Sequence, residues 1–256
     1  MILLELRQMT KEYPLWLRKD KGRKKAAVNN ASLSISKGES VALVGESGSG
    51  KSTIAKCIMR LEKITAGQIL WKGHSIHSKH LKDVTFYKSV QMVMQDSSAS
   101  LHPKMKVEEI LAEPIRNFFP EEKNWHEECN RLLHVVGLDT SFLKRFPNQL
   151  SGGQKQRVCI AKALAVKPEL IIFDESIASL DGQSQKAIIE VLRMIQRQEG
   201  LSYLFITHDL QSTKQLCDRV AVMYQGEIVE ILTQWERGRL AHPYSRLLYD
   251  TMNDCN

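Results

Sequence analysis

Val41–Ile58 reads VALVGESGSGKSTIAKCI and combines three different local patterns. Its four opening apolar residues are typical of a strand buried on both faces in a parallel sheet. Residues 45–52 then hold three glycines, three serines and one lysine, and a helical pattern follows them. Because glycine adopts backbone angles that other residues avoid, this loop can wrap with its N–H groups pointing inward.

This loop is predicted to bind phosphate. GESGSGKS fits the pattern G-x-x-x-x-G-K-[S/T] in its required context between a strand and a helix. The inward N–H groups and the positive N-terminal end of the helix form an anion site suited to polyphosphate. Lys51 is expected to reach the β- and γ-phosphates and Ser52 to hold Mg²⁺; the alternative is a flexible turn that only resembles the pattern. The predicted nucleotide-binding residues here are Gly45, Glu46, Ser47, Gly48, Ser49, Gly50, Lys51, Ser52 and Thr53.

A second group of polar residues follows two other predicted strands. Asp174 and Glu175 end the run PELIIFDE, and adjacent acids after a buried strand are costly without a partner. We expect Asp174 to associate with Mg²⁺ and Glu175 to activate water, whereas the alternative is that DES only caps the next helix. His208 in ITHDL is a predicted hydrogen-bond partner of the γ-phosphate or the attacking water, although a lone histidine is more often structural.

The remaining pattern predicts one α/β core with a helical insertion. Residues 107–165 are expected to be mostly helical, with Gly137 as a C-terminal cap. Alternation of strands and helices indicates a parallel sheet with ligands at the carboxyl ends of its strands. The predicted strands are residues 2–8, 26–36 and 41–44, the run after Pro168, SYLFITHD, and both arms of a hairpin around Gln225 and Gly226.

LSGGQKQR, Leu150–Arg157, separates this chain from many other nucleotide hydrolases. Ser151 and Gln154 have the spacing of a capping box, in which a serine begins a helix and a glutamine lies three residues later. A capped helix start with two glycines is a second anion site. A protein with two such sites could bind its own nucleotide at one and offer the other to a partner.

Six ordered motifs resemble those of the ATP-binding subunit of an ABC transporter, over nearly the whole chain. Gly45–Ser52 resembles the Walker A loop, Ile171–Glu175 the Walker B strand, and Leu150–Gln154 the ABC signature. The other matches are Gln95 as the Q-loop glutamine, Asp181 in the D-loop, His208 as the switch histidine, and Tyr13 as the aromatic that stacks on adenine, with Trp16 as its rival.

The resemblance implies the P-loop NTPase ABC ATPase fold: an α/β fold with a mainly parallel RecA-like sheet core, an antiparallel β subdomain and a helical insertion subdomain. It implies one domain over residues 1–256. The expected parts are a catalytic core at 1–95 and 166–232, a helical signature subdomain at about 96–165, and a C-terminal tail at 233–256.

The same resemblance implies ATP and Mg²⁺ as cofactors of an ATPase. Glu175, His208 and Lys51 are the implied catalytic residues. Ser52, Gln95 and Asp174 are the implied magnesium ligands, the last through water. In the implied head-to-tail dimer, each ATP lies between one subunit's phosphate loop and the other's Ser151, Gly152, Gly153 and Gln154.

Two stretches of sequence indicate a subfamily of ABC transporters. QDSSASLHPKMKVEEILAEPI and HPYS, His242–Ser245, resemble motifs of oligopeptide, dipeptide and nickel importers. Ser97 and Ser176 replace prolines, and His102 takes the place of an asparagine. With QRVC, FITHDL and the short tail, these departures most resemble the nickel-type second ATPase.

The expected function is therefore ATP hydrolysis that powers import of nickel, metal chelates or oligopeptides. The implied partners are a second ABC ATPase subunit, two transmembrane permease subunits and, indirectly, an extracytoplasmic solute-binding protein. The implied location is the cytoplasmic face of the cell membrane, held there through the permease.

Three other functions fit the sequence less well. A soluble ABC ATPase acting on ribosomes would need two cassettes, and one acting on DNA a long coiled coil before the signature. A P-loop kinase does not explain Leu150–Gln154. A non-hydrolysing subunit is opposed by Lys51, Glu175 and His208.

Composition agrees with a globular protein that stays in the cytosol. The net charge is +7, and Arg18–Lys25, with six basic residues and one acid, supplies +5 of it. The rest of the chain is near neutral, so no nucleic-acid partner is expected; the basic run favours a solvated loop, with anionic lipid or RNA as the alternative. Five scattered cysteines indicate reduced, mostly buried thiols. No apolar run approaches a membrane span, and MILLELRQMT does not fit a secretory signal.

Overall fold

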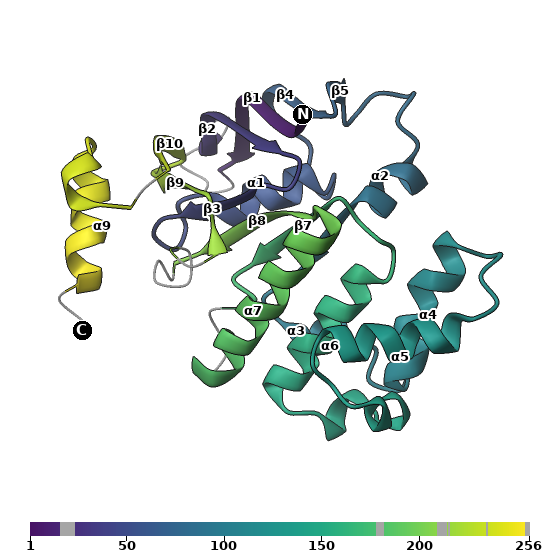
Figure 1. The fold of residues 1–256 in the computed structure, drawn as a ribbon. Coiled ribbons are helices and arrows are strands. Elements are labelled where there is room, and N and C mark those ends of the chain that lie inside the picture. The colour runs from purple at the N-terminus through teal and green to yellow at the C-terminus, as the bar shows by residue number, and fades with distance from the viewer. Residues whose placement is uncertain (16–23, 178–181, 209–213, 215, 234, 254–256) are drawn as a thin grey trace. The chain divides into compact units, whose positions relative to one another are not determined.

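The computed structural model describes residues 1–15, 24–177, 182–208, 214, 216–233 and 235–253, which form two compact units (Figure 1). Unit 1 contains Met1–Leu81 and Leu204–Asn256, and unit 2 contains Lys82–Tyr203. The predictions for Trp16, Asp181 and most of the basic segment fall outside the described residues. The division into core, signature subdomain and tail remains a prediction.

Unit 1 begins with an antiparallel sheet in the order β2-β1-β4-β5. Its strands are β1 (Ile2–Pro14), β2 (Lys24–Ser36), β4 (Ala66–Trp71) and β5 (His74–Ser75). Ala31, Leu33 and Ile35 alternate along β2 and are buried, as expected for a sheet with one face in the core. Both predicted strands are confirmed; β1 extends beyond residue 8 because its pairing with β2 continues to Pro14.

A second group of strands in unit 1 follows the order β10-β9-β3-β8. Its members are β3 (Ser40–Val44), β8 (Ser202–Thr207, of which unit 1 contains 204–207), β9 (Arg219–Tyr224) and β10 (Glu227–Leu232). β3 is buried throughout and pairs with β9 in parallel, which confirms the predicted buried parallel strand. Gln225 and Gly226 have φ angles of 46° and 91°, so the predicted hairpin turn is also confirmed.

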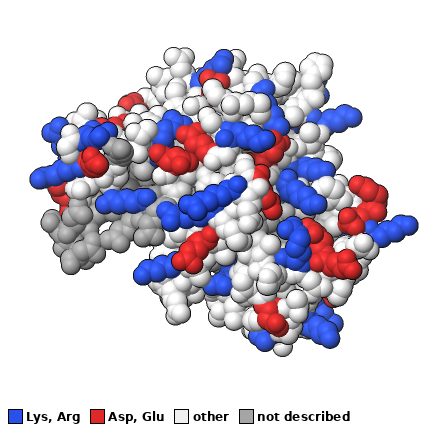
Figure 2. Space-filling view, in the orientation of Figure 1, with Lys and Arg blue, Asp and Glu red and all other residues white. Residues whose placement is uncertain are grey.

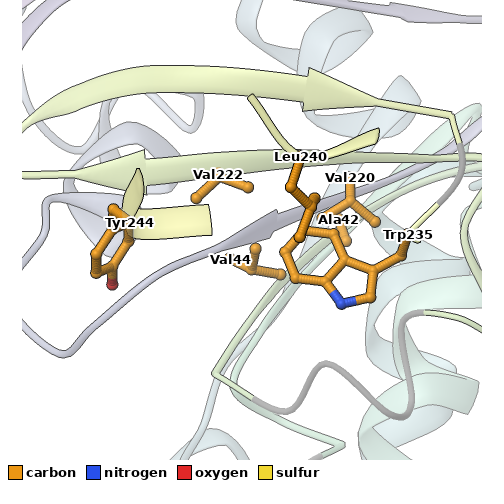
Figure 3. Close-up of a cluster of buried hydrophobic side chains, with 7 residues drawn as sticks. All are labelled: Ala42, Val44, Val220, Val222, Trp235, Leu240 and Tyr244. Atoms are coloured by element: carbon orange, nitrogen blue, oxygen red, sulfur yellow. The ribbon is translucent and has the colours of Figure 1, made fainter. Parts of the chain in front are cut away.

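Strand β3 is fixed at both of its ends. At the start, the Ser40 amide and hydroxyl each donate to the Asp218 carboxylate at 2.8 Å, and the Asp218 amide donates to the Ser40 carbonyl oxygen at 2.8 Å. Further along, Ala42 and Val44 belong to a buried apolar cluster (Figure 3). The other members of this cluster are Val220, Val222, Trp235, Leu240 and Tyr244.

The helical segments of unit 1 are α1 (Lys51–Ile58), the 3-10 turn η4 (Arg237–Arg239) and α9 (Pro243–Asn253). Helix α1 follows the phosphate loop, as predicted. The sequence patterns did not identify α9, whose first helical residue is a proline. Proline suits that position because the first turn of a helix needs no intrahelical N–H donor there.

Unit 2 is mostly helical, with a parallel strand pair β6 (Val90–Val93) and β7 (Leu170–Asp174). Its helices are α2 (Asp83–Ser89), α3 (Ser97–Ser100), α4 (Val107–Phe118), α5 (Trp125–Val135), α6 (Gly152–Leu164) and α7 (Gly182–Glu199), with 3-10 turns η2 (Thr140–Lys144) and η3 (Pro147–Gln149). The predicted helical character of residues 107–165 is confirmed. Gly137 has φ 68° just after α5, which confirms it as the C-terminal cap.

The surface carries both signs of charge. On the face drawn in Figure 2, Lys and Arg side chains are interspersed with Asp and Glu side chains. Among the described residues, none of the helices combines the length and apolar content of a bilayer span.

The four described cysteines are free thiols, and Cys57, Cys129 and Cys159 are buried. Burial is the main reason that the pKa of the Cys57 thiol rises to about 11 and that of Cys129 to about 12. For these residues the prediction of mostly buried cysteines outside any disulfide is confirmed, and their reduced state stays a prediction.

Replacing Gly137 with alanine is expected to destabilise the protein. The left-handed φ costs an L-residue about 1–2 kcal/mol, and the new Cβ would lie 3.0 Å from a terminal guanidinium nitrogen of Arg157. Thermal unfolding of the variant should shift down by roughly 2–6 °C. Gly182→Ala is the control, because a Cβ there meets nothing within 4 Å; equal melting temperatures for the two variants would contradict the capping role.

Candidate functional site

The phosphate loop of unit 1 connects β3 to α1 and needs glycine for steric reasons. Gly45 and Gly50 have φ angles of 153° and 108°. A Cβ at Gly45 would lie 2.1 Å from the Met223 carbonyl oxygen, and one at Gly50 would lie 2.2 Å from that of Ala27. Any side chain at either position would therefore displace the backbone of β9 or β2.

The N-terminal end of α1 opens into this loop. The first i→i−4 hydrogen bond of the helix joins the Ile54 amide to the Gly50 carbonyl oxygen at 3.1 Å. The N–H groups of residues 51–53 therefore precede the intrahelical ladder and point out of the positive end of the helix. No acidic side chain lies in the first turn of α1. This geometry fits an anionic ligand such as a polyphosphate.

The ammonium group of Lys51 lies inside the loop. Its Nζ donates to the carbonyl oxygens of Gly45 and Glu46, both at 2.7 Å, and to Ser49 Oγ at 3.4 Å. Lys51 is only 4% exposed, and a buried ammonium group needs such acceptors. The loop thus holds one positive charge directly beside its own backbone.

A hollow of about 590 Å³ adjoins the loop in unit 1. Tyr13 and Lys25 line it together with Gly48 of the loop and Gly226 of the hairpin turn. An aromatic ring and a phosphate loop therefore border one hollow, as a nucleotide with a flat base and a charged tail requires. Tyr13 thus lines the same hollow as the loop, and its stacking role stays a prediction; its rival Trp16 lies outside the described residues.

The Tyr13 side chain is held by groups that no motif identified. Its hydroxyl donates to the Glu62 carboxylate and also hydrogen-bonds with the Thr53 side chain. Lys11 Nζ lies 3.2 Å from Glu62 Oε2 and 4.8 Å from the centre of the Tyr13 ring. Burial, followed by the bond to Glu62, raises the pKa of Tyr13 to about 12, and the bond from Tyr13 lowers the pKa of Glu62.

These contacts give Glu62 and Thr53 a role in orienting the ring. The only sequence signal was that Lys11 and Tyr13 are two residues apart and so lie on the same face of β1. Glu62 comes from a distant turn after α1, which no local pattern could connect to Tyr13. The Thr53 side chain bonds to the tyrosine, and its predicted contact with nucleotide stays a prediction.

In unit 2, the two predicted acids lie at the end of strand β7. Asp174 is its last residue and Glu175 follows, both half-buried. Glu175 has φ 49°, a left-handed conformation uncommon for a residue with a side chain. Such strain is often found where a protein fixes a functional group. Ser176, which replaces a proline of the resembled motif, is buried in the turn that follows.

The segment around Gln95 is exposed and leads into the short helix α3. The Asp96 carboxylate accepts from the amides of Ser98 and Ala99 at 2.8 and 3.0 Å and so caps this helix. Ser97 is its first residue, a position where proline and serine are both accommodated because no intrahelical N–H donor is needed there. The serine at position 97, which replaces a proline of the resembled motif, therefore preserves the turn.

The signature segment forms the capped helix start that its sequence predicts. The Ser151 hydroxyl accepts from the Gln154 amide at 3.3 Å, and the Gln154 side chain accepts from the Ser151 amide at 3.0 Å. Ser151 and Gly152 are exposed at the beginning of α6. The predicted capping box is confirmed, and it presents a positive helix end to solvent.

The remaining predicted site residues are divided between the units. His208 is exposed directly after β8 and belongs to unit 1, as does Ser52. Gln95 and Asp174 belong to unit 2. Across the described part of the chain, no group of three or more His, Cys, Asp or Glu side chains could hold a metal ion. The predicted magnesium site needs no such group, because its donors are a hydroxyl, an amide and one carboxylate.

Comparison with known proteins identifies the family. Residues 28–178 match the family model described as ABC transporter. The chain belongs to the ABC transporter family. Two solved ABC structures are similar to it at 27% and 25% identity, with TM-scores of 0.80 and 0.77. The first is a dimeric, post-hydrolysis structure of the ATP-binding cassette MJ0796 bound to ADP and Pi, and the second is cbiO1 from Clostridium perfringens, part of the ABC transporter complex cbiONQ.

The solved structures cover most of both chains: 90% of this chain and 98% of MJ0796, and 91% and 88% for cbiO1. The expected fold class, the ABC ATPase fold with an antiparallel sheet and a second sheet that contains parallel pairs, is thereby confirmed.

Two relatives with similar sequences are named as import proteins. The oligopeptide transport ATP-binding protein OppF of Lactococcus lactis strain IL1403 is 44% identical over 206 residues, which are 80% of this chain. The nickel import ATP-binding protein NikE of Escherichia coli O157:H7 is 39% identical over 254 residues, 98% of this chain and 95% of that relative. The matched region spans 65% of the length of OppF. The resemblance to oligopeptide and nickel import ATPases is thus confirmed.

Removing the ring of Tyr13 is expected to weaken nucleotide binding. Aromatic stacking on a base contributes about 1–3 kcal/mol, so Tyr13→Ala should raise the Kd of a fluorescent ATP analogue by roughly five- to 150-fold. Tyr13→Phe keeps the ring and loses only the bonds to Glu62 and Thr53, so its Kd should rise a few-fold at most.

Trp16→Ala is the comparison for the rival residue. If this variant, and not Tyr13→Ala, loses affinity in the same titration, the stacking role belongs to Trp16 instead.

Proposed function

We propose that this chain is the ATP-hydrolysing subunit of an ABC importer for nickel, metal chelates or oligopeptides. The observation that carries the proposal is the loop of residues 45–52, which encloses the Lys51 ammonium group and opens beside the hollow lined by Tyr13. The names of the import relatives support the transport role. They favour it over the alternative, a soluble ABC ATPase that acts on nucleic acid or ribosomes.

The residues present fit ATP and Mg²⁺. The glycine-rich loop and the start of α1 offer N–H donors to phosphate oxygens, and Lys51 adds a positive charge. Ser52 of unit 1 offers a hydroxyl oxygen beside this loop, and Gln95 and Asp174 of unit 2 would add an amide oxygen and, through water, a carboxylate oxygen, which are donors that Mg²⁺ prefers. When bound, the ion neutralises charge on the β- and γ-phosphate oxygens.

Hydrolysis depends on three side chains in different roles. Lys51 exchanges neutral carbonyl acceptors for phosphate oxygens, because hydrogen bonds to an ionised acceptor are stronger. Glu175 accepts a proton from the attacking water as the water oxygen bonds to the γ-phosphorus; the bond from that phosphorus to the β–γ bridging oxygen breaks, and ADP leaves with this oxygen. His208 donates a hydrogen bond to the γ-phosphate. The left-handed backbone at Glu175 supports its assignment, since it fixes the direction of that side chain.

A second subunit completes the site. In a head-to-tail dimer, Ser151, Gly152, Gly153 and Gln154 of one subunit bind the γ-phosphate held by the other. The exposed, capped start of α6 suits this role because its N–H groups and dipole attract an anion. The dimeric, ADP- and Pi-bound MJ0796 cassette supports such an assembly. The partner is a second, different ATPase, and the dimer closes on ATP and reopens after hydrolysis.

The membrane subunits contact unit 2 near Gln95. A hollow of about 200 Å³ lies beside this segment, lined by Met92 of β6, by Met94 just after it, and by Cys159 and Lys162 of α6. Met94 is 49% exposed, as suits an apolar contact with a permease segment. Two permease subunits thereby hold the protein at the cytoplasmic face of the membrane. The solute is chosen by them and by an extracytoplasmic binding protein; Ser97, Ser176 and His102 favour nickel or a metal chelate.

Glu175→Gln tests the proposed base. The amide cannot accept the proton, so hydrolysis should fall by about 100-fold or more, while Mg²⁺-ATP binding is retained. The variant should form a stable ATP-dependent dimer on size-exclusion chromatography with light scattering, together with the second ATPase where the pair is required. Glu190→Gln, on the exposed face of α7, is the matched control. Full turnover by Glu175→Gln would rule out the assigned base.

Met94→Glu tests the permease contact. A charge on this apolar surface should reduce co-purification with the two permease subunits and remove their stimulation of ATP hydrolysis. ATP binding by the detached subunit should stay unchanged. Met194→Glu is the control, because Met194 on α7 is similarly exposed at 42%. If both variants co-purify equally with the permease, the contact lies elsewhere.

A further inference from the structure

The HPYS segment places one tyrosine against the phosphate loop. Tyr244, the second residue of α9, is 6% exposed, and its ring stacks on Tyr224 with centroids 4.2 Å apart. Figure 3 draws Tyr244 in the apolar cluster with Val44 and Val222. Val44 is the last residue before the loop, so the cluster lies directly beneath the point where the loop begins.

The hydroxyl of Tyr244 contacts the loop itself. The Glu46 amide donates a hydrogen bond to it at 2.9 Å. The carbonyl group of the same peptide unit belongs to Gly45, and its oxygen accepts from Lys51 Nζ at 2.7 Å. Because a peptide unit is planar, fixing the direction of its N–H group also fixes the direction of its carbonyl group. One rigid plane therefore joins Tyr244 to Lys51.

Hydrogen bonds hold the segment that leads into Tyr244, residues 241–243, in place. The Glu230 carboxylate of β10 accepts from the amides of Ala241 and His242 at 2.7 and 3.3 Å. The Tyr244 amide in turn donates to His242 Nδ1 at 3.2 Å. Pro243 begins the helix between them. Each residue of His242–Tyr244 thus contributes to the placement of one phenolic oxygen.

The ring and the hydroxyl of Tyr244 have separable roles. Phenylalanine would preserve the stacking on Tyr224 and the apolar packing. It would remove the acceptor of the Glu46 amide and so release the direction of the first peptide unit of the loop. The hydroxyl therefore acts on the loop, whereas the ring acts on the core.

We propose that Tyr244 is a positioning residue for Lys51, which it orients through the Gly45–Glu46 peptide plane. This inference rests on the proposed function, since it assumes that the loop binds nucleotide phosphates. It gives the HPYS motif a physical role in the ATP site of its own subunit. Tyr244 does not itself touch the nucleotide. It restricts the orientation of the peptide unit between Gly45 and Glu46, the first of the loop.

Tyr244→Phe tests the proposal. Loss of one hydrogen bond of ordinary strength should raise the Kd for a fluorescent ATP analogue about two- to tenfold. The KM for ATP should rise by the same factor, with kcat unchanged. Tyr249→Phe, a tyrosine of the same helix that packs on Trp235, is the matched control and should bind as the wild type does. A purely structural role would lower the melting temperature of Tyr244→Phe without raising its Kd.

Hydrogen exchange on the unmodified protein gives a second test. Coupling between two sites is reciprocal, so bound ATP should slow amide exchange in residues 241–249 at least twofold. In Tyr244→Phe this protection should be lost, and in Tyr249→Phe it should remain. Absence of ATP-dependent protection in the wild type would overturn the inference even if the variant failed to fold.

Lys51→Ala separates this inference from the proposed function. If that variant binds ATP as the wild type does, the loop is not the nucleotide site and both fail. If Lys51→Ala loses binding while Tyr244→Phe keeps a wild-type Kd, only the role of Tyr244 is refuted.

Discussion

A lysine ammonium group enclosed by backbone carbonyl oxygens is the constraint on which unit 1 depends. Removing a charge from water costs several kcal/mol unless acceptors replace the solvent, and the oxygens of Gly45 and Glu46 provide them. Those oxygens point inward only because the glycines of the loop adopt angles that side chains would forbid. The neighbouring strands hold that turn in place. Strand β3 leads into it, β9 and the hairpin turn pack against it, and β2 lies beside Gly50.

The sequence was most informative where structure is set by local chemistry. The strand–loop–helix order, the hairpin at Gln225 and Gly226, the cap at Gly137 and the capping box of Ser151 all follow from residues close together in the chain. Strands β4 and β6 were not anticipated. Their short apolar runs carry little periodicity and become strands through pairing with distant partners, β1 and β7. Helix α9 was also not anticipated; its packing on the core through Tyr244 depends on Val44 and Val222, which lie far from it in the chain.

In the candidate site, too, local features could be predicted and contacts between distant residues could not. Motifs identified the residues expected to act on the phosphates, and the geometry of residues 45–53 agrees with them in unit 1. They did not connect Glu62 with Tyr13, or Tyr244 of the HPYS motif with Glu46, although the structure shows a hydrogen bond in each pair. A local pattern has no means to register a contact between positions 46 and 244. The departures from the family pattern proved compatible with the fold: His102, in place of asparagine, still accepts from the amide two residues later, at 3.4 Å.

The raised thiol pKa values of the buried cysteines have a practical consequence for spectroscopy. Thiolates are the species that react with maleimide dyes and nitroxide spin labels, and Cys57, Cys129 and Cys159 form few of them near neutral pH. With Cys255 replaced by serine, a cysteine introduced at an exposed position should take up label selectively. Pairs of such labels could then report distances between the two units, without redesign of the native core.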